Sequence, residues 1–165
     1  MRTALALYEP DIAQNVGTTL RTAVCLAVPV HIIHPCGFAF SARSVRRAGM
    51  DYLDHVEVVE HDDWDAFAAW ATGERRRLVL LTTQASVPYA AHRFEARDVL
   101  LMGRESAGVP PHVHASADAR LAIPMALGRR SLNVAVAAGM VLGEALRQQA
   151  GFPAPVAGGT DPGSA

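Results

Sequence analysis

The sequence predicts an α/β domain built on a mostly parallel sheet that helices cover on both faces. Short apolar runs typical of buried strands recur along the chain, and segments with helical spacing separate them. The length of 165 residues suits one domain, since domains average about 150 residues. We therefore expect a single domain over residues 1–150 and a disordered Gly/Pro-rich tail over residues 151–165.

The chain opens with a strand and then a helix. Residues 3–8 form a short β-like run, and the spacing of apolar residues over 12–27 is typical of a helix. A second strand is expected at residues 29–34, followed by a short basic helix at residues 42–48. These units have the strand-then-helix order of an α/β sheet.

Six more elements continue the alternation. Asp62 or Asp63 would cap a helix expected at residues 62–71, because a carboxylate there accepts hydrogen bonds from free backbone N–H groups. Ligands bind beyond the carboxyl ends of parallel strands, so the loops after Thr83, Met102 and Ile123 should converge on one site. The expected elements are a strand at 55–60, a helix at 62–71, strands at 78–83, 99–102 and 121–123, and a final helix at 132–149.

Composition excludes several classes of protein. Half of the residues are hydrophobic, 19% are charged and the formal charge is −1, which is the range of globular proteins. No apolar run approaches the roughly 18 to 20 residues that a membrane-spanning helix needs, and the N-terminus does not resemble a signal peptide. We therefore expect a cytoplasmic protein. All 15 basic residues are arginine, which excludes catalytic lysine chemistry.

Neither the cysteines nor the histidines predict a metal site. Cys25 and Cys36 are too few for a disulfide framework and lack the spacing of a zinc site, so buried reduced thiols are expected. The seven histidines include His112 and His114, but no set of carboxylates or cysteines completes a closed site around them. We expect no bound metal.

Asn15 and Arg21 follow the first strand and could act on a substrate. An amide can orient a hydroxyl group, and a guanidinium offers a planar fork of donors to a phosphate. The six-residue spacing leaves open whether the two side chains share a face of the helix. A capping asparagine and a solvent-facing arginine remain the alternative.

Residues 103–108 directly follow a predicted buried strand and contain glycine at both ends. Two glycines allow the backbone to approach a ligand closely, while Pro110 and Pro111 suit the opening of a helix. The segment matches neither the dinucleotide-binding nor the P-loop fingerprint. A pocket for adenosine, lined by backbone, fits this segment better than a phosphate-binding loop.

A third segment precedes the final helix. Ser131 is expected to be the N-cap, and the helix N-terminus that begins there can receive a carboxylate or a phosphate. The helix is apolar on nearly all sides, so it should be buried in the core or at a subunit interface. Gly139 and Gly143, four residues apart, would allow another backbone to come close.

Together these segments resemble the three motifs of the SPOUT superfamily of RNA methyltransferases. Within it, the chain is most similar to the minimal tRNA (cytidine/uridine-34) 2′-O-methyltransferase family, with Gly143 standing where family members carry a tyrosine. The resemblance runs in order and without large insertions. It covers residues 7–21, 31–38, 46–52, 81–83, 102–110, 123–125 and 130–133.

The resemblance implies a deep C-terminal trefoil knot, a homodimer and the cofactor S-adenosyl-L-methionine. It implies methyl transfer to the ribose 2′-hydroxyl of tRNA nucleotide 34, with Asn15 and Arg21 at catalytic positions. Because a guanidinium is a poor proton acceptor, Arg21 is expected to clamp a phosphate. Ser131 and Asn133 would orient the ribose or the cofactor. Cofactor contacts are implied for Leu81, Gly103, Glu105, Ile123, Met125, Ser131 and Leu132.

The expected RNA partner is the anticodon stem-loop of tRNA. Since the net charge is close to zero, a dimer would combine basic patches from both subunits. Two alternatives stay open: a methyltransferase acting on another tRNA position or on ribosomal RNA, and a non-catalytic RNA-binding module. The arginines expected to contact RNA are Arg43, Arg46, Arg47, Arg129 and Arg130.

Overall fold

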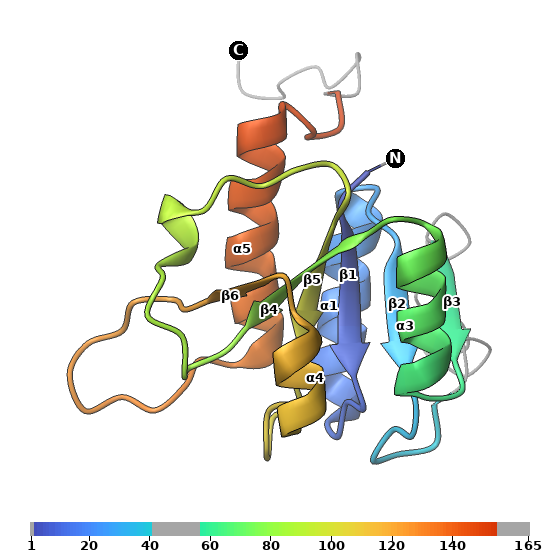
Figure 1. Cartoon of the computed structure of the whole chain (residues 1–165). Coiled ribbons are helices and arrows are strands. Elements are labelled where there is room, and N and C mark those ends of the chain that lie inside the picture. Colours follow the sequence, from blue (N-terminus) through green and yellow to red (C-terminus); the bar gives the residue numbers. More distant parts are fainter. Residues whose placement is uncertain (1, 41–56, 155–165) are drawn as a thin grey trace, which may run out of the picture.

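Within residues 2–40 and 57–154, which this computed structural model describes, six parallel strands form one sheet (Figure 1). Their order across the sheet is β3-β2-β1-β5-β4-β6, and every neighbouring pair is parallel. The prediction of a mostly parallel sheet is therefore confirmed. The strands are β1 (Ala4–Tyr8), β2 (Val30–Ile33), β3 (Val58–His61), β4 (Arg77–Leu81), β5 (Asp98–Met102) and β6 (Ala119–Leu121).

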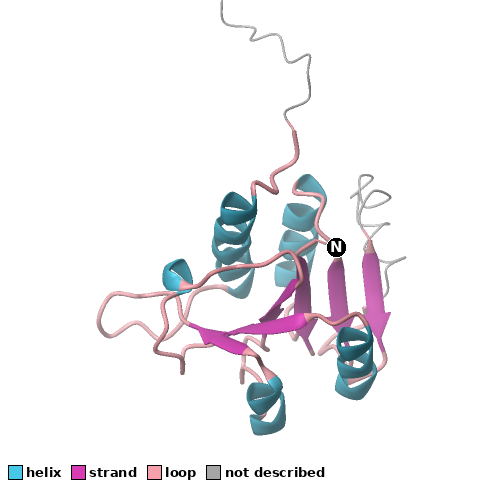
Figure 2. Ribbon diagram, turned by 45° about the horizontal axis from the view of Figure 1, so that its top comes forward, coloured by secondary structure: helices cyan, strands magenta, loops and turns pink. Residues whose placement is uncertain are grey.

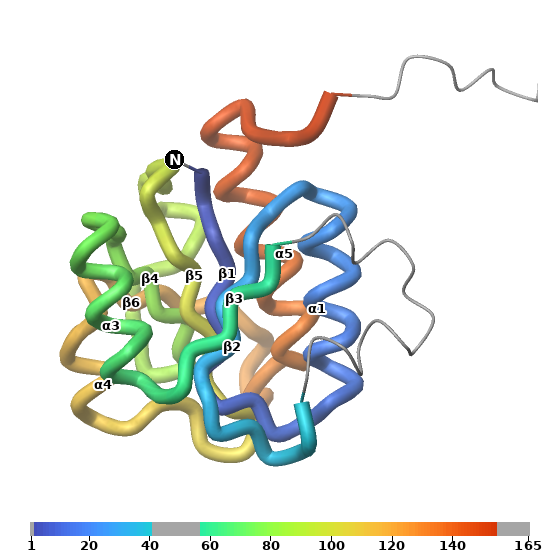
Figure 3. Tube along the Cα trace, turned by 90° about the vertical axis from the view of Figure 1, so that its right-hand side faces the viewer, coloured from blue at the N-terminus to red at the C-terminus, as the bar shows by residue number. Residues whose placement is uncertain are grey.

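Helices cover both faces of this sheet, as the sequence predicts. Figure 3 shows α1 (Ala13–Cys25) and α5 (Val134–Gln149) side by side on one face. The opposite face carries α3 (Trp64–Gly73) and α4 (Pro111–Ser116), which Figure 2 shows below the sheet. A short 3-10 helix, η2 (Tyr89–Ala91), lies in the connection between β4 and β5.

Alternation along the strands supplies both cores. Leu5 and Leu7 of β1 belong to the apolar cluster under α1 and α5, whereas Ala4 and Ala6 belong to the cluster under α3 and α4. Successive side chains of a strand point to opposite faces, so a strand that is apolar throughout contributes to two cores. This explains why β1 appears in the sequence as a continuous apolar run.

The predicted elements that fall on described residues all occur, with ends that differ by a few residues. Asp63 is the N-cap of α3, and its carboxylate accepts a hydrogen bond from the N–H of Ala66 at 2.8 Å. Helix α4 begins at Pro111, where the proline pair indicated a helix opening. The predicted basic helix at 42–48, with Arg43, Arg46 and Arg47, and residues 155–165 of the tail lie outside the described residues. The trefoil knot stays a prediction.

The predicted cap of the final helix is wrong. Asn133, not Ser131, caps α5, and its Oδ1 accepts hydrogen bonds from the N–H groups of Ala135 and Val136 at 2.9 and 3.2 Å. Asparagine and serine cap equally well, so the position is decided by where helical dihedral angles begin. The backbone of Asn133 is still extended, with ψ 136°.

Complete burial of α5 is also wrong for the single chain. Its buried face packs on the sheet and α1, but Val136 and Met140 on the other side are 52% and 39% exposed. A Cβ built on Gly139 or Gly143 would meet no described atom within 4 Å. An exposed apolar helix face of this kind fits the other alternative, a subunit interface.

The two cysteines are free thiols, but their predicted burial is wrong. Cys25, at the end of α1, is exposed, and Cys36 is half-buried. Burial raises the pKa of the Cys36 thiol to about 11, which makes this thiol unreactive at neutral pH.

No helix in the described part of the chain is long and apolar enough to cross a membrane.

Two stacked histidines lie in the core between the sheet and α3. His31 Nδ1 and His61 Nε2 are 2.9 Å apart, and both side chains are buried against Phe67 and Trp70. Burial, with a smaller contribution from the neighbouring imidazole, lowers the pKa of His31 to about 3. Burial also lowers the pKa of His61. Both rings are therefore neutral in the folded protein at neutral pH.

This pair predicts a loss of stability in mild acid. The unfolded chain has the higher histidine pKa, about 6.5, so it binds more protons and stability falls as the pH drops below that value. We expect a slope of up to about 1.4 kcal/mol per pH unit for each histidine between roughly pH 6 and 5. Urea denaturation of the wild type and of the His31→Phe/His61→Phe variant across this range measures it.

The double variant should show a shallower slope than the wild type. His112→Phe is the control, because His112 lies exposed on α4 and its substitution should leave the slope unchanged. Equal slopes for the wild type and the double variant would contradict the assignment of the acid sensitivity to this pair.

Candidate functional site

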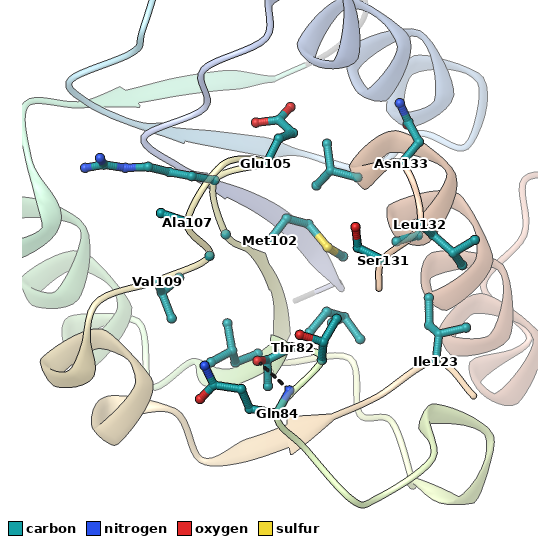
Figure 4. A pocket seen from close by; sticks show the side chains of 18 of the residues that line it. Thr82, Gln84, Met102, Glu105, Ala107, Val109, Ile123, Ser131, Leu132 and Asn133 are labelled. Atoms are coloured by element: carbon teal, nitrogen blue, oxygen red, sulfur yellow. Dashed lines mark hydrogen bonds between the residues drawn. The ribbon is translucent and has the colours of Figure 1, made fainter. Parts of the chain in front are cut away.

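A cavity of about 630 Å³ opens at the carboxyl ends of β4, β5 and β6 (Figure 4). Its walls come from the loops after these strands, from the start of α1 and from the segment that leads into α5. The predicted convergence of the loops after β4, β5 and β6 is therefore confirmed. The volume lies within the range of about 300–1,000 Å³ that small-molecule sites occupy.

The loop after β5 forms one wall and is closed on itself. Arg104 and Gly108 exchange two backbone hydrogen bonds, each 2.9 Å long. Gly108 has φ +67°, and a Cβ on Gly103 would lie only 2.7 Å from the carbonyl carbon of Gly108. Both glycines are thus required by the backbone: one by its conformation and one by close approach. Residues 103–108 of this loop all line the cavity.

Two asparagines and a glutamate join three distant segments beside the cavity. Asn133 Nδ2 donates to Asn15 Oδ1 at 2.8 Å, and Asn15 Nδ2 donates to Glu105 Oε1 at 2.9 Å. Asn133 also accepts N–H groups of α5 through its Oδ1, so its amide can point only one way. The orientation of each amide in this Asn133–Asn15–Glu105 relay therefore follows from the helix cap.

Asp11 ties the same loop to the chain after β1. Its carboxylate accepts the backbone N–H groups of Glu105 and Ser106 at 3.2 and 3.3 Å, and the Ser106 hydroxyl as well. In return, the N–H of Asp11 donates to Glu105 Oε2 at 3.3 Å. The hydrogen bond with Glu105, supported by those from Ser106, lowers the pKa of Asp11 to about 2. Burial, and then the contact with Asp11, raises the pKa of Glu105.

Arg104 makes the third connection between the loop and this segment. Its guanidinium forms an ion pair with Glu9 and lies over the ring of Tyr8, 5.7 Å from the ring centre. Glu9 adopts a left-handed backbone with φ +41°, which is uncommon for a residue other than glycine. Three consecutive loop residues are thus bound to three positions of the segment after β1.

The structure brings most of the predicted site residues together and separates a few. Arg21 lies on the exposed side of α1 and does not line the cavity, because six residues of helix rotate it about 120° away from Asn15. Arg129 is exposed and also lies off the cavity wall. The predicted residues that line it are Asn15, Leu81, Gly103, Glu105, Ile123, Met125, Arg130, Ser131, Leu132 and Asn133.

Sequence reasoning missed Glu9, Asp11 and Arg104 as residues that shape the site. A lone acid between a strand and a helix has no distinctive spacing, and its partners lie more than 90 residues further along the chain. Among the described residues, no group of three or more histidines, cysteines and carboxylates is placed to hold a metal ion. The walls combine apolar, amide and charged groups, which suits an organic molecule with a polar end.

Comparison with known proteins gives a consistent result. Residues 2–143 match the SpoU rRNA Methylase family. The tRNA (cytidine(34)-2'-O)-methyltransferase of Beijerinckia indica subsp. indica is 62% identical over 144 residues, which cover 87% of this chain and 90% of that protein.

Solved structures agree in fold. One, described as giving insights into the 2-OH methylation of C/U34 on tRNA, has a TM-score of 0.83 and 40% identity, covering 91% of this chain and 97% of its own. An AdoMet-bound rRNA methyltransferase from Sinorhizobium meliloti has a TM-score of 0.77 and 30% identity, covering 88% of this chain and 56% of its own.

The two roles of Asn133 can be separated by substitution. Asn133→Ala removes both the helix cap and the donor to Asn15, and we expect it to cost about 1 kcal/mol of stability. Asn133→Ser keeps an acceptor for the cap but has no amide donor, so its stability should stay near that of the wild type. Chemical denaturation measures the stability of each variant.

Both variants remove the donor to Asn15 Oδ1, so that only the hydrogen bond to Glu105 still orients the Asn15 amide. Faster hydrogen exchange of the Asn15 side-chain amide, followed by NMR, is the expected sign in each. If the exchange stayed at its wild-type rate in the serine variant, the relay would not depend on Asn133.

Proposed function

The chain belongs to the SpoU rRNA Methylase family, and we propose that it methylates the ribose 2′-hydroxyl at wobble position 34 of tRNA. The methyl donor is S-adenosyl-L-methionine, and the target nucleotide is cytidine or a modified uridine. One observation of the structure carries the proposal: a cavity at the carboxyl ends of β4, β5 and β6 whose walls are the segments that resemble the family's three motifs. The protein is thus a tRNA (cytidine/uridine-34-2′-O)-methyltransferase.

The cavity fits this cofactor in size and in chemistry. Apolar side chains and the loop backbone suit a nucleoside, whereas the amides, hydroxyl and carboxylate suit the charged amino-acid end. When bound, the cofactor supplies an electrophilic methyl group on a sulfonium. The residues proposed to hold it are Leu81, Gly103, Glu105, Ile123, Met125, Ser131 and Leu132.

The polar groups beside the cavity would orient the ribose. In-line transfer requires the attacking oxygen to lie about 3 Å from the methyl carbon, in line with the bond that breaks. The Asn133–Asn15–Glu105 relay fixes the direction of two amides at the cavity wall before any substrate arrives. Ser131, which has no capping role, lines the same wall and is proposed to orient the ribose or the cofactor with Asn133.

Arg21 is proposed to clamp the phosphate next to the target nucleotide. Its guanidinium cannot act as a base, so a phosphate oxygen or a water molecule would accept the proton of the hydroxyl. Arg21 lies on the exposed side of α1, away from the cavity of its own chain. We propose that it serves the cavity of a second subunit.

A homodimer is supported by the uncovered apolar face of α5. Val136 and Met140 lie on that face, and Gly139 and Gly143 leave room for another backbone. Arg129 and Arg130 lie exposed beside the cavity and are proposed to contact the anticodon stem-loop; Arg43, Arg46 and Arg47 stay candidates outside the described residues. A tRNA substrate is consistent with a cytoplasmic location.

The direct test is transfer of labelled methyl groups to bulk tRNA from a strain that lacks wobble 2′-O-methylation. We expect label in 2′-O-methylcytidine or 2′-O-methyluridine at position 34, located by nucleoside mapping. Label at another position, or in ribosomal RNA, would keep the reaction but change the target. An unlabelled product together with no binding of the cofactor would favour the non-catalytic module.

A second prediction concerns Arg21 and the dimer. Arg21→Ala and Glu105→Ala chains are each expected to be inactive, because one lacks the clamp and the other lacks the end of the relay. Heterodimers of the two, isolated with two different affinity tags, should regain roughly half of the wild-type activity, since one of their two sites is intact. Inactive heterodimers would show that Arg21 acts on its own chain's cavity.

A further inference from the structure

Asp11 does not line the cavity, yet it holds two residues that do. Glu105 and Ser106 belong to the cavity wall, and their backbone N–H groups both donate to the carboxylate of Asp11. The Ser106 hydroxyl donates to the same carboxylate. The loop after β5 therefore has its position set by a side chain outside the cavity.

The contact between Asp11 and Glu105 is reciprocal. The backbone of each residue donates to the carboxylate of the other, at 3.3 and 3.2 Å. This pair of hydrogen bonds fixes both the distance and the rotation of the loop relative to the segment after β1, which a single hydrogen bond would not do. Hydrogen bonds to an ionised acceptor are also stronger than neutral ones.

The loop after β2 packs against Asp11 and the residue before it. A Cβ on Gly37 would lie 2.9 Å from both the Cα and the Cβ of Asp11, so only glycine fits at that position. The N–H of Gly37 also donates to the carbonyl oxygen of Pro10 at 2.9 Å. Asp11 thus lies between Gly37 and the loop after β5 and contacts both.

We infer that Asp11 is a positioning residue that holds residues 105 and 106 in the conformation that binds the methyl donor. This inference rests on the proposed function, since it assigns the loop to S-adenosyl-L-methionine. Without the carboxylate, two N–H groups and one hydroxyl of the loop lose their common acceptor, and the loop must order itself when the cofactor binds. The cost appears as weaker cofactor binding and not as a slower chemical step.

Asp11→Asn is the informative variant. The amide keeps the size of the side chain but has one acceptor oxygen instead of two, and its NH₂ group faces N–H donors of the loop. We expect the Kd for S-adenosyl-L-methionine, measured by calorimetry, to rise about 10-fold. The KM for the cofactor should rise in step, while kcat at saturating cofactor and the Kd for tRNA stay within about 2-fold.

Two further variants separate positioning from stability. Ser106→Ala removes only the hydroxyl contact, so we expect a rise in Kd of about 2- to 3-fold, and the effects of the two substitutions should not multiply in the double variant. Asp118→Asn is the matched control, because Asp118 also accepts a backbone N–H from another segment, that of Leu78 at 2.7 Å, away from the cavity. It should leave the Kd for the cofactor unchanged.

The outcomes distinguish this inference from the proposed function. An Asp11→Asn variant that binds the cofactor as tightly as the wild type would overturn the positioning role while leaving the function intact. A variant with unchanged Kd and KM but a lower kcat would overturn it as well. Failure of the wild-type chain to bind S-adenosyl-L-methionine would overturn the proposed function and this inference together.

Discussion

The direction of a single amide group, that of Asn133, determines how the polar side of the site is built. The N-terminus of α5 offers only N–H groups, so the amide oxygen of Asn133 must face the helix. Its nitrogen then faces Asn15, which leaves the nitrogen of Asn15 to face Glu105. Each step allows one orientation only, because an amide has one accepting and one donating end. A helix cap thus orders side chains 90 and 118 residues apart in the sequence.

The sheet register is what makes these contacts possible. Met102 of β5 pairs with Leu7 of β1 on one side and with Leu81 of β4 on the other, and Leu81 pairs with Leu121 of β6. Four strands therefore reach the same level at their carboxyl ends, and the segments that follow them begin side by side. Since β5 lies between β1 and β4, the loop after β5 begins next to the segment after β1. Glu9, Asp11 and Asn15 can then bind three successive loop residues without any long connection.

Much of this architecture could be predicted from the sequence, because it depends on hydrophobic pattern. Apolar runs locate the strands, their parallel order follows from the intervening helices, and ligand sites of such sheets lie at the carboxyl ends. The contacts of Asp11 could not be predicted, because they depend on which strands become neighbours. The cap of α5 was misplaced for a related reason: Ser131 and Asn133 are equally good caps, and the choice depends on how far the extended segment runs along the cavity.

The charges around the site also limit how an RNA can approach it. Glu9 and Asp11 contact the loop after β5, which itself carries Glu105. Arg104 pairs with Glu9, and the low pKa of Asp11 keeps that carboxylate ionised at neutral pH. Here the three carboxylates outnumber the one guanidinium, that of Arg104, so this surface disfavours the approach of a phosphate. Arg129 and Arg130 lie exposed on the segment that leads into α5, and Arg130 lines the cavity. On the function proposed above, we therefore expect the RNA backbone to approach along Arg129 and Arg130 and not across the carboxylates at the loop after β5.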